Sequence, residues 1–105
     1  MIVSIRTTQE VVVAGLSYAF VEMFQGLEVS VEELGPFEVG VIVGPVRRKE
    51  TTRYLRKSEL REFLVGVLRD VEHQLREQGY RPVDGGWLNA EDADFLLTEP
   101  HPVFL

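Results

Sequence analysis

Hydrophobic side chains recur every three or four positions over residues 58–78. The recurring positions are Leu60, Phe63, Leu64, Val67, Leu68, Val71 and Leu75. This spacing places them on one face of an α-helix and leaves the other face, which carries His73, to water. Ser58 is a plausible N-cap, and Gly79 is the expected C-cap. The pattern therefore predicts an amphipathic helix over residues 58–78.

A second helical pattern covers residues 8–25. Its apolar residues recur at helical spacing and do not alternate as they would in a half-buried strand. Thr7 or Thr8 can cap the start of this helix, and Gly26 follows it as a C-cap would. The β-branched residues 11–13 oppose a helix, so a β-meander running through this region is the alternative.

Strand patterns occupy shorter stretches of the chain. They are found at residues 2–6, 27–32, 37–43 and 80–83. Residues 27–32 alternate between apolar and polar side chains, as in a half-exposed strand, whereas residues 37–43 are more apolar. The turn signal Gly35-Pro36 joins these two strands into a hairpin. Pro82 restricts the last strand to the edge of a sheet.

The predicted order is β-α-β-β-α-β followed by a C-terminal extension. This order is that of a ferredoxin-like α+β sandwich, and we expect one such domain over residues 1–105. Residues 51–55 are either a loop or a further strand. In this arrangement the helices cover one face of the sheet, while Ile42 points towards the other face.

Composition narrows the class of protein. The chain has 105 residues, of which 45% are hydrophobic and 27% charged, which is the balance of a folded globule. It has no cysteine, which excludes a disulfide scaffold and a cysteine nucleophile. The single Asn and the lack of Cys match the thermophile tendency towards fewer thermolabile residues, whereas nine Arg against two Lys is a weaker marker that GC-rich coding also explains. Without a signal-peptide pattern or an apolar run near the ~20 residues of a membrane span, we expect a cytoplasmic protein with no membrane partner.

Charge is distributed unevenly along the chain. The formal net charge is −6, yet residues 47–57 contain six basic residues and one acidic residue. The candidate anion- or partner-binding residues in this segment are Arg47, Arg48, Lys49, Arg53, Tyr54, Arg56 and Lys57. Such residues can contact phosphates while the ring stacks on a base, although an acidic protein is a poor match for nucleic acid. The alternative is a solvated loop that meets an acidic patch on the same protein or on a copy of it.

Candidate chemistry is otherwise sparse. His73 and His101 lack partners at metal-ligand spacing, and the glycines form no phosphate-binding motif. Glu32 and Glu33 form one acidic cluster, which is explained by the protection of a strand edge against aggregation. A second cluster over residues 91–94 is explained by the preference for acidic residues at a helix N-terminus. We therefore predict no catalytic residue, metal ligand or cofactor.

The C-terminal extension is unusually apolar. Its large apolar residues, which we expect at an oligomer interface, are Trp87, Phe95, Val103, Phe104 and Leu105. The sequence thus favours a binding or regulatory protein-interaction domain that forms a homo-oligomer, most simply a homodimer. The alternatives are a dimeric α+β enzyme or small-ligand-binding domain, and a nucleic-acid-associated protein that acts through residues 47–57.

Overall fold

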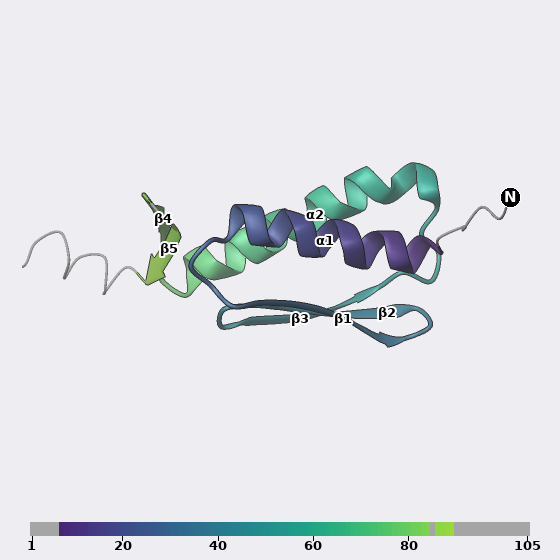
Figure 1. The fold of residues 1–105 in the computed structure, drawn as a ribbon, viewed down its shortest axis with the longest axis horizontal. Helices are drawn as coiled ribbons and strands as arrows, with labels where there is room; N and C mark the ends of the chain where they lie inside the picture. Colours follow the sequence, from purple (N-terminus) through teal and green to yellow (C-terminus); the bar gives the residue numbers. More distant parts are fainter. Residues whose placement is uncertain (1–6, 85, 90–105) are drawn as a thin grey trace, which may run out of the picture.

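The structure, a computed structural model, describes residues 7–84 and 86–89. In chain order its elements are α1 (Thr8–Met23), β1 (Val29–Gly35), β2 (Glu38–Val43), β3 (Val46–Thr51), the 3-10 turn η1 (Lys57–Glu59), α2 (Leu60–Glu77), β4 (Tyr80–Val83) and β5 (Gly86–Asn89) (Figure 1). The protein is therefore an α+β protein, as its sequence predicted. The predicted strand at residues 2–6 lies outside the described residues.

Helix α1 confirms the helix predicted over residues 8–25, although it ends at Met23 and its C-cap is Phe24 rather than Gly26. Thr7 caps it, because its hydroxyl accepts a hydrogen bond from the backbone N–H of Glu10 while the Glu10 carboxylate accepts one from the N–H of Thr7, each at 3.1 Å. The residues it buries include Val12, Leu16 and Phe20, at helical spacing. These side chains offset the poor helix propensity of residues 11–13.

Helix α2 confirms the predicted amphipathic helix, with one correction at its start. Val67, Val71 and Leu75 are buried, whereas Leu64 and Leu68 are only partly buried. Ser58 is not the N-cap, because it lies inside η1. The turn starts earlier because the Glu59 carboxylate accepts a hydrogen bond from the backbone N–H of Arg56 at 3.2 Å.

The C-cap of α2 is Gln78, and the predicted capping glycine, Gly79, is the residue that follows it. Gly79 follows the helix with a φ of +91°, a conformation that disfavours residues with a side chain. Its backbone N–H donates to the carbonyl of Arg76 at 3.0 Å.

The main sheet is an antiparallel meander in the order β1-β2-β3. The predicted hairpin is confirmed, and its register pairs Val31 with Val41. Strand β3, which pairs with β2 over its whole length, was not predicted. It lacks an apolar alternation because it is an edge strand, and charged residues are common on such strands.

Two features of the sheets differ from a ferredoxin-like arrangement. β3 pairs with β2, next to which a ferredoxin-like sheet would place the strand predicted at residues 2–6. In addition, β4 pairs with β5 in a separate two-stranded sheet. The order of elements is loosely ferredoxin-like, but the described strands form two separate sheets rather than the single sheet of that arrangement. Strands β4 and β5 form an antiparallel hairpin in which Val83 pairs with Gly86.

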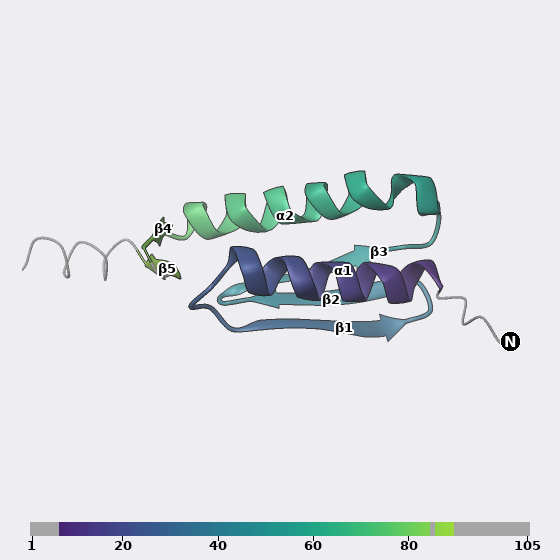
Figure 2. The ribbon, with the colours of Figure 1, turned by 45° about the horizontal axis from the view of Figure 1, so that its top comes forward.

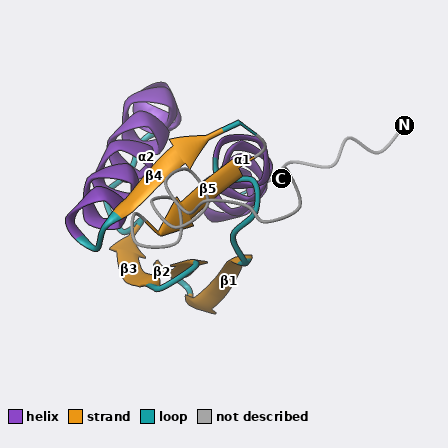
Figure 3. Cartoon of the chain, turned by 90° about the vertical axis from the view of Figure 1, so that its left-hand side faces the viewer, coloured by secondary structure: helices purple, strands orange, loops and turns teal. Residues whose placement is uncertain are grey.

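Both helices lie on the same face of the three-stranded sheet (Figure 2). They run side by side and begin at the same end of the molecule. Between the two layers, the core includes buried side chains from both helices and from the helix-facing side of β2, such as Val39, Val41 and Val43. Viewed along the helices, no described element covers the opposite face of the sheet (Figure 3). We call this the open face.

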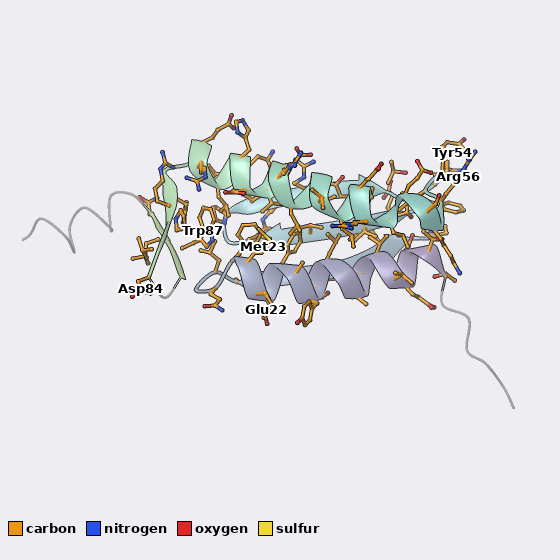
Figure 4. The ribbon with its side chains drawn as sticks, turned by 90° about the horizontal axis from the view of Figure 1, so that it is seen from above. Glu22, Met23, Tyr54, Arg56, Asp84 and Trp87 are labelled. Atoms are coloured by element: carbon orange, nitrogen blue, oxygen red, sulfur yellow. The ribbon has the colours of Figure 1, made fainter. Side chains whose placement is uncertain are left out.

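Trp87 holds the β4–β5 hairpin against the end of α1 (Figure 4). Its indole Nε1–H donates to the carbonyl of Met23, and its backbone N–H donates to the carbonyl of Gln25, both at 2.8 Å. Its ring centroid lies 5.5 Å from that of Phe24, and the residue is 6% exposed. The second sheet is therefore joined to the main core through the buried Trp87 side chain, and Tyr80 of β4 also packs against that core.

Candidate interaction surface

Strand β3 divides the predicted basic segment between the two faces of the sheet. Arg47 pairs with Ile42 and Lys49 pairs with Gly40, so these two cations lie on the open face. Arg48 alternates with them and points towards the helices. The rest of the segment lies beyond β3, in the loop and turn that lead into α2.

Arg48 is a structural residue. Its Nε lies 2.7 Å from Glu50 Oε1, and its Nη2 lies 3.2 Å from Asp70 Oδ2 on α2. The Arg48 side chain is only 21% exposed and that of Glu50 only 14%. For this residue, the structure agrees with the expectation of pairing with acids of the same protein.

Arg53, Tyr54, Arg56 and Lys57 lie at the end of the molecule where α2 begins (Figure 4). Arg53 stacks on the Phe37 ring, with its guanidinium carbon 4.8 Å from the ring centroid. Tyr54 is 88% exposed, and the other three residues are exposed as well. The residues of the predicted basic site are thus brought into three separate settings rather than into one surface.

A polar contact that sequence reasoning missed holds this end together. Gln9 is buried on α1, and its Nε2 donates to the carbonyl of Gly35 at 2.6 Å. Its Oε1 accepts a hydrogen bond from the Thr52 hydroxyl at 2.9 Å. The sequence does contain a signal for this contact, because Gln9 lies one turn before Val12 on the apolar side of the helix. Beside it is a surface hollow of about 510 Å³ that is partly lined by Arg53 and Glu33.

The open face is organised in rows that run across the three strands. One row is Ser30, Ile42 and Arg47, and the next is Glu32, Gly40 and Lys49. Ile42, which the sequence directed to this face, is half-buried. Strand β1 thus contributes an acid, β2 contributes the apolar or small residues, and β3 contributes the two bases.

A shallow hollow of about 330 Å³ lies over Gly40. Leu34 leans over this glycine so closely that an added Cβ would lie 3.0 Å from a Leu34 methyl carbon. Leu34 itself is 47% exposed. The centre of the open face therefore combines a depression with exposed apolar side chains.

The charges on either side of this hollow do not neutralise each other. Glu32 and Lys49 belong to outer strands separated by β2, so their backbones are roughly 10 Å apart. Within residues 7–84 and 86–89, neither of them forms an ion pair, and nor does Arg47. The open face is consequently acidic along one edge and basic along the other.

The remaining candidate residues lie elsewhere. Trp87, expected at an oligomer interface, is buried in the core described above. Phe95, Val103, Phe104 and Leu105 lie outside the described residues, as do His101 and the acidic cluster 91–94. His73 is exposed on α2, where its Nε2 lies 2.9 Å from Glu77 Oε1.

The described part of the chain offers neither a metal site nor a membrane span. It contains no group of three or more His, Cys, Asp or Glu side chains that could hold a metal ion. Neither of its helices has the length and apolarity to cross a bilayer.

Comparison of the chain with protein-family models, with curated proteins and with solved structures finds no match.

Proposed function

We propose that the protein is a protein-interaction domain and that the open face binds its partner. The observation that carries this proposal is the composition of that face. Ile42 and Leu34 expose apolar surface at its centre, and charges of opposite sign border it on β1 and β3. An apolar centre within a charged rim is the usual composition of a protein-binding surface, because the centre gains from burial and the rim selects the partner.

Nucleic-acid binding is supported less well by the same residues. Arg48 is held by two carboxylates, while Arg47 and Lys49 flank a surface that also carries Glu32. A polyanion would meet repulsion from that carboxylate and from the net charge of −6. A protein partner can match both signs of charge at once.

Photo-crosslinking in the host cell tests the proposal. A photoreactive phenylalanine analogue at Ile42 would sample the centre of the open face, and the same analogue at the exposed Glu22 of α1 would be the matched control. We expect a specific protein adduct from position 42 and none of comparable yield from position 22. Equal yields at the two positions, or no adduct at position 42, would contradict the proposal.

A further inference from the structure

The open face is complementary in charge to a copy of itself. In its central row, Glu32 and Lys49 flank Gly40 on opposite sides. Neither side chain is ion-paired within the described residues, because β2 separates them. Two copies related by a two-fold axis parallel to β2 would place β1 of each over β3 of the other. Glu32 of each copy would then face Lys49 of its partner, and both charges would be matched twice.

From this complementarity we propose that the partner of the open face is a second copy of the chain, bound face to face about a two-fold axis along β2. This inference rests on the proposed function of that face. Ile42 then meets the Ile42 of the partner copy on the axis, and the exposed Leu34 side chain of each copy, which lies over Gly40, packs beside it. Packed sheets cross at about −30°, which leaves the central rows aligned.

Other symmetric arrangements bring like charges together. A two-fold axis perpendicular to the strands, within the interface, would place Glu32 over the partner copy's β1 and Lys49 over its β3. Extension of the sheet through two β1 edges would bring Glu32 and Glu33 close to their own copies. Pairing through two β3 edges would do the same for Arg47 and Lys49. Like charges directly opposite each other destabilise a pair, so the axis along β2 is favoured.

The size of the face sets the expected affinity. Three strands about 4.8 Å apart and six or seven residues long present a smaller area than the ~800 Å² that each partner buries in a standard interface. Most of the rim is charged, and exposed ion pairs contribute little in water. We therefore expect a reversible dimer with a dissociation constant in the micromolar range.

Charge reversal distinguishes this dimer from the alternatives. Glu32→Lys would place the introduced ammonium group opposite Lys49 twice, and Lys49→Glu would place the introduced carboxylate opposite Glu32 twice. By sedimentation velocity on the full chain, we expect each variant alone to dissociate roughly tenfold or more readily than the unmodified protein. An equimolar mixture of the two variants should associate again, because in the mixed dimer every pair is of opposite sign.

The control is Glu22→Lys, which changes the net charge as Glu32→Lys does but lies on α1. It should leave the dissociation constant unchanged within about twofold, since long-range charge effects are screened by salt. Unfolding curves for all variants would confirm that each is folded before association is compared.

Several results would overturn the inference. One is an unmodified protein that stays monomeric up to high micromolar concentration. Another is a Glu32→Lys variant that associates as readily as the unmodified protein, which would fit the axis that crosses the strands, because like charges face each other there before and after the substitution. A third is a mixture of the variants that does not associate. In each case the crosslink at position 42 distinguishes failure of the proposed dimer from failure of the proposal that the open face binds a protein. An adduct with a different protein would retain the open face as an interaction surface and refute only the second copy, whereas no adduct would refute both.

Discussion

At the scale of single residues, the two ends of the molecule are held together by side chains that belong to no periodic pattern in the sequence. At one end, Trp87 packs beside Phe24, and the guanidinium carbon of Arg76 lies 5.5 Å from the centroid of the Trp87 ring. At the other end, Gln9 links the β1–β2 turn to the segment after β3. A lone Trp near an apolar C-terminal extension indicated an interface by composition alone. Its burial depends on the path of the hairpin, which the sequence pattern does not specify.

Gly86 is predicted to be essential for docking of the β4–β5 hairpin. A Cβ at this position would lie 2.5 Å from the carbonyl oxygen of Gln25, and the φ of +148° disfavours a residue with a side chain. We expect Gly86→Ala to lower the free energy of unfolding by about 1–3 kcal/mol. Because Trp87 is the only tryptophan, its emission should shift to the red as the hairpin loosens.

The control for this variant is Gly35→Ala, since a Cβ at Gly35 meets nothing within 4 Å. It should change stability by no more than ~0.5 kcal/mol and leave the emission spectrum unchanged. Equal stability losses from the two substitutions would show that the hairpin is not packed against Gln25 as described.

Thr52 is predicted to contribute through its hydroxyl rather than its shape. It is 5% exposed, and Thr52→Val keeps its volume but leaves the buried Gln9 Oε1 without its donor. Chemical denaturation should show a loss of about 1–3 kcal/mol, the usual cost of an unsatisfied buried polar atom. The matched change at the exposed neighbour, Thr51→Val, should cost less than ~0.5 kcal/mol. A neutral Thr52→Val variant would refute the role of the Gln9 contact.

At the scale of elements, the sequence predicted both long helices, the β1–β2 hairpin and strand β4. Each of these has a strong local signal, such as the apolar stripe of α2 or the alternation in β1. β3 was not predicted, because residues 47–50 are all charged and their strand conformation depends on pairing with β2. The same dependence on tertiary structure explains why only part of the α2 stripe is buried. Leu64 and Leu68 are only partly buried although they pack against the core, where Leu64 lies over Gly15 of α1, whereas Val67, Val71 and Leu75 are buried.

Among the residues of α2, Leu75 should be the most sensitive to truncation. It is fully buried in the core, so Leu75→Ala is expected to lower the free energy of unfolding by about 2–5 kcal/mol. On the same helix, Val65 is 38% exposed, and Val65→Ala should be within ~0.5 kcal/mol of the unmodified protein because alanine is the better helix former. A thermal unfolding series would reveal the difference. Similar losses for both would mean that α2 packs with another face inward.

At the scale of the whole molecule, the charge asymmetry of the sequence becomes an asymmetry across the sheet. The candidate site was predictable in part: Ile42 was directed to the open face, and the basic segment was singled out. The pairing of Arg48 and the position of Arg47 and Lys49 opposite Glu32 were not, because they follow from the strand register. A segment of high positive charge thus became one edge of a surface that carries both signs.

This arrangement predicts that nucleic acid does not bind. With labelled single- and double-stranded oligonucleotides at low salt, fluorescence anisotropy should show no association, because a net charge of −6 repels a polyanion. Binding that weakens steeply with salt, with a slope reduced by Arg53→Ala, would instead favour the nucleic-acid alternative.

The face-to-face dimer can be observed directly in an isotope-filtered nuclear Overhauser experiment at high micromolar concentration, in which one half of the protein is labelled with ¹³C and the other half is unlabelled. We expect contacts between the Ile42 methyl groups of the two copies, because Ile42 lies on the proposed axis. Contacts that arise instead from the exposed Tyr18 and Val21 of α1, or no intermolecular contact at all, would contradict the proposed dimer.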